Sequence, residues 1–309
     1  MKIPLLRPVV PPHVFCLLAD GVTYARVRRE EPVGFAEARS FAYPANALGS
    51  SPTGTPLFTR EALSEAVTAA RRLTEGRLSR ASVVFPDSWA RILSIDFDSL
   101  PATREAVREM VLWKLKKLLP GVTSELAATF REMPHDGGEA QGRRLLVAAA
   151  PVESLRSIEE GFESLGVRVG VLAPASLVLF EGMAPALSAR SRGDYGLLHR
   201  TPDAFCLVIA RGGAPLFFRQ RPAEEQAEEH EQELRLSLSY YTEKLQGPGL
   251  AAVYIHDELG GRDLAETAVF PVPPVPLSGG IFGADAGFDE RIAARPELLS
   301  AFAAVWGRN

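Results

Sequence analysis

Short apolar runs and helix-spaced apolar positions alternate along most of the chain. Apolar runs bounded by glycine, proline or aspartate predict strands, whereas apolar residues three and four positions apart predict helices. In the first half, this pattern predicts strands at 14–18, 23–28, 81–86, 91–97, 126–132, 143–149 and 167–172, and helices at 59–73, 103–119 and 151–165. The alternation of strand and helix from 81 to 171 indicates an α/β unit with burial on both faces.

The second half repeats this alternation. Strands are expected at 195–199, 204–210, 215–219 and 250–256, and helices at 223–245 and 296–306. The sequence Arg-Gly-Gly at 211–213 favours a hairpin turn between two of these strands. Because both halves combine strand pairs, hairpins and helices, the pattern predicts two lobes built from duplicated α/β units.

The composition is that of an ordinary globular protein, with 46% hydrophobic and 23% charged residues in a chain of 309. The formal net charge of −4 gives no basic field that would draw the chain to nucleic acid or anionic lipid. Cys16 and Cys206 lie within apolar runs and are expected to be buried thiols, because two isolated cysteines give neither metal spacing nor a disulfide framework. This use of cysteine fits a reducing cytosol.

No apolar run reaches the roughly 18–20 residues that a membrane-spanning helix needs. The apolar N-terminus is interrupted by Pro4, Pro8, Pro11 and Pro12, which also argues against a signal peptide. We therefore expect a cytoplasmic protein that does not insert into a membrane itself. If it works at a membrane, another protein must hold it there.

The sequence lacks the usual motifs for nucleophilic, metal-dependent and phosphate-binding chemistry. No catalytic residue and no metal ligand is predicted, since the five histidines are scattered without metal-ligand spacing. His199 and His256 each end an expected strand, where ligands gather in α/β folds. Asp257 and Glu258 follow His256, so a cation site there is an alternative to the core or solvated roles that the sequence favours.

Several segments, taken in order, resemble the PilM family of actin-like proteins from type IV pilus assembly. The family's strand pair is similar to residues 83–97, VVFPDSWARILSIDF, and its tryptophan-bearing helix to residues 111–121, VLWKLKKLLPG. The strand, helix and strand that complete its inserted subdomain are similar to residues 143–172, and the short helix that leads into its second lobe is similar to residues 175–183, ASLVLFEGM. The helix and strand before its adenosine loop are similar to residues 233–256, ELRLSLSYYTEKLQGPGLAAVYIH.

The resemblance implies an α/β, actin-like (ribonuclease H-like) fold with two lobes and an inserted α/β subdomain. Residues 1–80 would form the first part of the first lobe, and residues 81–172 the inserted PilM-type subdomain. Residues 173–309 would form the remainder of the first lobe and a reduced second lobe.

Nucleotide-binding members of this superfamily hold ATP and magnesium between two hairpins that carry acids and glycines. The first hairpin of this chain keeps Asp20, Gly21 and Thr23 as vestigial cofactor-binding residues. The second has the bulky residues 198–200, Leu-His-Arg, where the family has an acid followed by glycine. Side chains of this size hinder the close approach of backbone to phosphate.

Two further nucleotide elements are also altered. The chain passes almost directly from Pro222 to Glu224, which leaves out the family's lysine-bearing helical stretch. The segment expected to form the adenosine loop has only Gly260 and Gly261. We therefore expect no bound cofactor, neither ATP nor magnesium, and no enzymatic activity. The alternative is an actin-like ATPase or sugar-kinase-like enzyme with drifted motifs, in which Asp20 is the only well-placed carboxylate.

PilM proteins bind the short cytoplasmic N-terminus of PilN, a bitopic inner-membrane protein, in a groove beside the inserted subdomain. By resemblance we expect a non-catalytic scaffold, a pseudo-ATPase held at the inner membrane by a PilN-like partner, with the pilus assembly ATPase as a further candidate partner. An extended peptide can pair with a strand edge and place side chains in pockets. The partner-binding residues expected in the groove are Phe85, Arg91, Leu93 and Leu146.

The family resemblance leaves a second machine open. The L-type cytoplasmic component of a type II secretion system shares the fold. That family usually continues into a transmembrane helix, whereas this chain ends at Asn309 without one.

Overall fold

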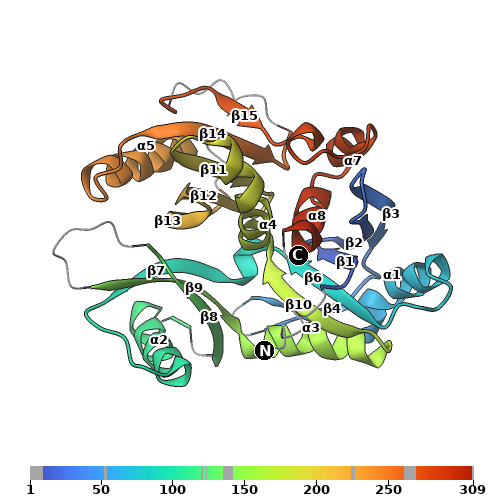
Figure 1. Cartoon of the computed structure of the whole chain (residues 1–309). Coiled ribbons are helices and arrows are strands. Elements are labelled where there is room, and N and C mark those ends of the chain that lie inside the picture. Colours follow the sequence, from blue (N-terminus) through green and yellow to red (C-terminus); the bar gives the residue numbers. More distant parts are fainter. Residues whose placement is uncertain are drawn as a thin grey trace, which may run out of the picture.

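Two five-stranded sheets, a three-stranded sheet and a two-stranded ribbon make up the β-structure of the described residues (Figure 1). The computed structural model describes residues 10–51, 54–119, 121–122, 124–134, 142–223, 227–260 and 269–307. The two large sheets form two lobes, and the three-stranded sheet lies beside them, at the lower left of Figure 1. This arrangement agrees with the predicted two-lobed α/β architecture.

The first lobe is built on the sheet with strand order β10-β6-β1-β2-β3. Its parts are β1 (His13–Leu17), β2 (Gly21–Arg28), β3 (Gly34–Ala42), β6 (Arg80–Phe85), β10 (Arg168–Pro174), the ribbon strands β4 (Leu48–Ser50) and β5 (Pro56–Phe58), and helices α1 (Arg60–Leu73) and α3 (Val152–Ser164). Apolar residues at helical spacing on α1 and α3 share one core with β1, where the rings of Phe15 and Phe162 lie 5.0 Å apart. The expected hairpin of β1 and β2 is present as an antiparallel pair.

The second lobe is built on the sheet with strand order β13-β12-β11-β14-β15. Its parts are β11 (Asp194–Arg200), β12 (Ala204–Arg211), β13 (Ala214–Pro222), β14 (Leu250–Asp257), β15 (Pro274–Pro276) and helix α5 (Ala227–Glu243). The Tyr241 hydroxyl of α5 donates a 2.7 Å hydrogen bond to the buried Asp194 carboxylate, which also accepts two bonds from Arg211. A buried carboxylate with this many donors ties the helix to the sheet.

The three-stranded sheet is antiparallel, with order β7-β9-β8, and packs against one helix. Its elements are β7 (Arg91–Phe97), β8 (Leu126–Glu132), β9 (Arg143–Pro151) and α2 (Arg104–Leu118). Thr103 caps α2 by accepting a hydrogen bond from the Ala106 amide. The apolar stripe of α2, including Val107 and Val111, covers one face of the sheet, while Ile92 and Leu146 belong to the central core of the molecule.

Helices α4 (Ala175–Arg190) and α8 (Leu298–Trp306) pack against each other in the middle of the molecule, between the two large sheets (Figure 1). Every residue of α8 from Leu298 to Val305 is buried, so this helix is surrounded by protein on all sides. The two helices touch at Gly182, where a Cβ atom would overlap the carbonyl oxygen of Ala303. Glycine at this position therefore sets how closely the helices pack.

The strand pairing does not follow the predicted domain boundaries 1–80, 81–172 and 173–309. The boundaries themselves stay a prediction. Strands β6 and β10 lie at the two ends of the expected inserted subdomain, but both belong to the first sheet. There β6 pairs with β1 on one side and with β10 on the other. Helix α3 also packs on the first lobe. The separate unit is thus narrower than 81–172 and comprises β7, α2, β8 and β9.

Several elements differ from the sequence prediction. Strand β3 was not expected, because it lies at an edge of the sheet and its exposed residues, Ala36, Arg39, Ser40 and Ala42, do not alternate regularly with buried ones. Helix α4 runs to Arg190, well past the short helix that the family resemblance implies. Helix α5 is described from Ala227, and residues 224–226 of the expected helix 223–245 lie outside the described residues. The remaining short elements are the 3-10 turns η1 (Asp87–Trp89) and η2 (Gly279–Ile281) and helix α7 (Phe288–Ala294).

We predict that Gly182→Ala lowers the free energy of unfolding by about 1–3 kcal/mol, because the added methyl group has to push α8 away from α4. Urea unfolding monitored by circular dichroism measures this. The control is Gly280→Ala, since the nearest atom to a Cβ there is the Ser278 hydroxyl oxygen at 3.9 Å. Equal stability of the two variants would show that the helix contact is not tight.

Candidate functional site

A cavity of about 440 Å³ opens between the two lobes. Its walls come from the turn between β1 and β2, the end of β6, the turn between β11 and β12, and the segment that leads into α8. Because these turns belong to both large sheets, any ligand in the cavity contacts both lobes. In open α/β sheets, ligands commonly bind at the carboxyl ends of the strands.

Four carboxylates line this cavity: Asp20, Asp203, Glu258 and Glu297. Asp203 is held by hydrogen bonds from the Ser88 amide (2.7 Å) and the Thr201 hydroxyl. Glu297 accepts a 2.6 Å bond from the Thr23 hydroxyl. Among the described residues that line the cavity there is neither a lysine nor an arginine, nor a glycine. The cavity therefore attracts cations and repels anions such as phosphates.

Two buried histidines lie side by side next to Glu258, one of the carboxylates that line the cavity. Strands β11 and β14 are parallel neighbours, and their register pairs His199 with His256, so both rings stand on one face of the sheet. The rings are stacked with centroids 5.2 Å apart. Both residues are almost completely buried, with 2% and 5% of their surface exposed. The parallel register thus joins residues that the sequence separates widely.

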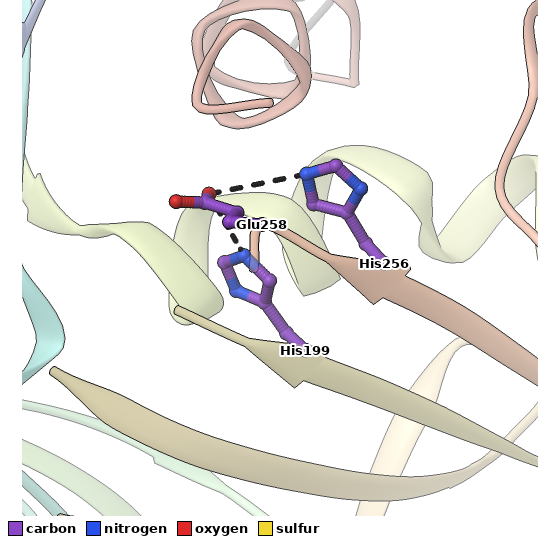
Figure 2. A group of neighbouring side chains, drawn as sticks. All are labelled: His199, His256 and Glu258. Atoms are coloured by element: carbon purple, nitrogen blue, oxygen red, sulfur yellow. Dashed lines mark hydrogen bonds and ion pairs between the residues drawn. The ribbon is translucent and has the colours of Figure 1, made fainter. Parts of the chain in front are cut away.

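The carboxylate of Glu258 faces one ring nitrogen of each histidine (Figure 2). Its amide donates a 2.8 Å hydrogen bond to the Arg200 carbonyl, which turns the chain just after β14. One of its carboxylate oxygens, Oε1, lies 3.1 Å from His199 Nε2 and 3.9 Å from His256 Nε2. Asp257 points elsewhere and forms a bidentate pair with Arg200. Of the two acids that the sequence offered for a cation site, only Glu258 faces the histidines.

A buried hydrogen-bond chain continues from His199 away from the cavity. Asp87 is fully buried and accepts bonds from both the amide and the hydroxyl of Ser176, in the first turn of α4. The positive end of the helix dipole favours a carboxylate there. Ser176 Oγ also lies 2.7 Å from His199 Nδ1. Since the only hydroxyl proton of Ser176 goes to Asp87, this oxygen accepts from the Nδ1–H group of His199.

Burial favours the uncharged form of each of these groups, so it raises the pKa of the acids and lowers the pKa of the histidines. Desolvation raises the pKa of Asp87 to about 6, opposed by the His199 ring and the Ser176 hydrogen bonds. It also raises the pKa of Glu258 to about 7, with Glu297 adding to the effect. It lowers the pKa of His199 and lowers that of His256 to about 4. Both imidazoles are therefore neutral at neutral pH.

The structure places the vestigial nucleotide residues in different roles. Asp20 lines the cavity, Thr23 is buried on β2 and binds Glu297, and Gly21 packs where a Cβ would overlap the Phe41 carbonyl oxygen. The second hairpin turns at 201–203, beyond the Leu-His-Arg segment, and carries Asp203. Of the other nucleotide elements, residues 224–226 and 261–268 lie outside the described residues.

Sequence reasoning also missed Asp87, Ser176 and Asp203. The pair Pro86-Asp87 after an apolar strand, and Pro202-Asp203 between two strands, each carry a turn signal that could have marked an acid at a strand end. No local signal marks Ser176, because its role depends on hydrogen bonds to Asp87 and His199, which are distant in the sequence. Cys16 and Cys206 are free and buried, as predicted.

The four expected partner-binding residues do not lie together. Phe85 lines the interlobe cavity, where its ring stacks on that of Trp89. Leu146 lies in a narrow pocket beside α4. Arg91 and Leu93 line a groove of about 220 Å³ between β7 and β13, which shares Ser88 and Asp203 with the interlobe cavity. That these four residues bind a partner stays a prediction.

The side chain of Gln220 joins β13 to β7 at this groove. Its Oε1 accepts a 2.7 Å hydrogen bond from the Ile92 amide, and its Nε2 donates to the carbonyl oxygens of Asp87 and Ala90. The three bonds hold the three-stranded sheet against the second lobe. The groove therefore has walls from two different sheets.

Within the described residues, no helix is long and apolar enough to cross a membrane.

Comparisons with known proteins show the fold. No family model matches the sequence, and a search of curated proteins gives no significant match. The solved PilM–PilN type IV pilus biogenesis complex matches with a TM-score of 0.74 and 19% identity, covering 98% of this chain and 100% of the matched chain. A Bacteroides thetaiotaomicron protein described as having an actin-like ATPase fold matches with a TM-score of 0.52 and 10% identity, over 97% and 99% of the two chains. The predicted PilM-like, actin-like fold is therefore confirmed.

We predict that the stability of the protein falls as pH rises from about 4 to about 6 through the contribution of Asp87. Its pKa is raised in the folded state, so between these values the folded chain holds more protons than the unfolded chain, and ionisation costs about 2–3 kcal/mol. Asp87→Asn removes this contribution. Urea unfolding from pH 4 to pH 7 should give curves for the two proteins that are not parallel.

The exposed carboxyl variant Asp98→Asn is the control, and its curve should run parallel to that of the unmodified chain. Parallel curves for Asp87→Asn would show that Asp87 keeps an ordinary pKa.

Proposed function

We propose that the chain is a non-catalytic adaptor of a type IV pilus or related secretion machine, located in the cytoplasm and held at the inner membrane by a PilN-like partner whose N-terminal tail it binds. The observation that carries the proposal is the whole-chain likeness to a chain of the PilM–PilN complex. The likeness extends over 98% of this chain and 100% of the matched chain. The pilus assembly ATPase is a further candidate partner.

The electrostatics of the interlobe cavity support a role without ATP. Triphosphate sites use backbone amides near glycine, lysine side chains and magnesium to offset the phosphate charge. The described lining of this cavity offers carboxylates and apolar side chains such as Leu17 and Phe85. Without a basic group, a triphosphate there would meet like charge. We propose that ATP with magnesium is not a cofactor and that the protein is not an enzyme.

One observation favours the alternative of an actin-like ATPase. Asp20 and Asp203 stand on the two hairpin turns that face the same cavity, as the acids of nucleotide-binding relatives are expected to do. Carboxylates in such positions can orient the waters around Mg²⁺. The absence of a basic group from the described lining weighs against this alternative, because magnesium alone would have to offset all of the phosphate charge.

The groove between β7 and β13 suits an extended peptide. Leu93 and Leu119 give it apolar walls, and Arg91 places positive charge at its rim. Arg221 at the rim is paired with Glu233, and Asp203 adds one carboxylate to the lining. An extended tail with apolar side chains and a carboxylate group would complement both features. The groove is small, so tethering of the partner to the membrane would have to raise the effective concentration of the tail.

We predict that an ATP analogue carrying a fluorophore does not bind in the presence of Mg²⁺ at concentrations up to about 1 mM, where the binding free energy would be about −4 kcal/mol. Equilibrium titration followed by fluorescence anisotropy measures this. Saturable micromolar binding that is lost in Asp20→Ala would instead establish the ATPase alternative.

We predict that the N-terminal tail of a PilN-like protein encoded beside this chain is retained by the immobilised protein. Leu93→Asp and Arg91→Glu should each weaken the tail's affinity by about tenfold or more, equivalent to at least about 1.4 kcal/mol. Pull-down at low salt, followed by anisotropy of a labelled tail peptide, measures this.

The matched control for the tail experiment is Arg60→Glu, which reverses an exposed charge at the start of α1, away from the groove. If the unmodified protein does not retain the tail, the adaptor proposal is wrong. If tail binding survives both groove variants, the tail binds elsewhere on the protein.

A further inference from the structure

We propose that His199, His256 and Glu258 form a binding site for one divalent transition-metal ion, with Zn²⁺ as the best-fitting example. The site borders the interlobe cavity through Glu258, and all three ligand atoms lie within 4.8 Å of one another (Figure 2). The proposal goes beyond the adaptor function, because tail binding in the groove beside β7 does not require it.

The spacing of the three side chains is close to that of a metal site. Two atoms bound at about 2.0–2.1 Å to a tetrahedral Zn²⁺ lie about 3.3–3.4 Å apart. The observed distances from Glu258 Oε1 to the two Nε2 atoms, 3.1 Å for His199 and 3.9 Å for His256, lie on either side of that value. Binding requires Glu258 Oε1 and His256 Nε2 to approach each other by roughly half an ångström. It also requires the Nε2 proton of His256, which the Pro296 carbonyl accepts, to move to Nδ1, so that Nε2 can bind the metal.

The hydrogen-bond chain behind His199 provides an independent indication. Because Ser176 accepts from the Nδ1–H group, the neutral ring has an unprotonated Nε2 with its lone pair turned toward Glu258. A lone pair and a carboxylate oxygen 3.1 Å apart repel each other unless a proton or a cation lies between them. The same Ser176–Asp87 pair is the kind of partner that fixes the tautomer of a metal-binding histidine.

The surroundings supply what a bound ion needs beyond three ligands. Glu258 also lines the interlobe cavity, so an ion bound to it lies beside a space in which water or another ligand can take a remaining coordination position. The carboxylates of Asp20 and Asp203 on its walls further favour a divalent cation. Two imidazoles and one carboxylate select zinc and neighbouring metals, whereas Mg²⁺ and Ca²⁺ prefer oxygen ligands. The ion is therefore distinct from the magnesium that accompanies ATP.

Binding of Zn²⁺ to the full chain, freed of any histidine tag and of trace metal, tests the proposal directly. Isothermal titration calorimetry should show one equivalent bound with micromolar or tighter affinity, and Co²⁺ should give the visible absorption of a low-coordinate site. Millimolar Mg²⁺ should not displace Zn²⁺. Absence of saturable binding below about 0.1 mM, or equal competition by Mg²⁺, overturns the proposal.

Variants assign the ligands. Glu258→Gln and His256→Gln should each weaken Zn²⁺ binding by about a hundredfold or more, and Ser176→Ala by about tenfold, since loss of an outer partner costs about 10–100-fold. His13→Gln is the control, because His13 bonds to Tyr24 on the first lobe, outside the cavity lining. Unchanged affinity in Glu258→Gln overturns the assignment.

A second measurement covers the case in which a ligand variant folds poorly. Zn²⁺ that binds the folded state raises the unfolding temperature of the unmodified chain by mass action. The rise should persist in His13→Gln and be lost in any ligand variant that gives a native far-ultraviolet circular dichroism spectrum. A Zn²⁺-independent unfolding temperature in the unmodified chain contradicts the proposal.

Discussion

The close packing of α4 against α8 at Gly182 determines how the two large sheets are placed relative to each other. Both helices belong to the core that spans the two large sheets, so their separation sets the distance between the lobes. The segment just before α8 carries Pro296 and Glu297 into the wall of the cavity, and the start of α4 carries Ser176 to Asp87. A contact between backbones in the apolar core thus positions polar groups at the candidate site. Packing at native density transmits such positions with little tolerance.

Much of the fold could be predicted from the sequence because its elements carry strong periodic signals. Helices α1 and α3 show apolar residues at helical spacing, and the strands that end in His199 and His256 are continuous apolar runs. Helix α4 shows no such signal over its full length, since it is buried on nearly every side and contains Pro185. Strand β3 alternates weakly at a sheet edge. A periodic pattern of apolar residues indicates an element with one buried face and one exposed face. Neither α4 nor β3 has such a clear division.

The site was less accessible to sequence reasoning, because its geometry depends on pairing between distant segments. That His199 and His256 end strands could be seen in the sequence, but their contact follows from the parallel register of β11 and β14. Asp87 has the local setting of a turn residue, and its burial depends on Ser176 and Gln220 from other parts of the chain. The resemblance to nucleotide-binding relatives drew attention to residues 198–200, while the acid of that hairpin stands at Asp203. A fold is shared more widely than the chemistry of its cleft.

The placement of the three tryptophans gives the molecule a built-in optical reporter. Trp89 lines the interlobe cavity, Trp113 is 57% exposed on α2 beneath the Lys117 ammonium, and Trp306 packs against Phe302 at the end of α8. Only the first of these indoles borders the space that a small ligand would enter. A change in intrinsic emission on ligand addition would therefore arise mainly from one ring, so occupancy of the cavity could be followed without labels.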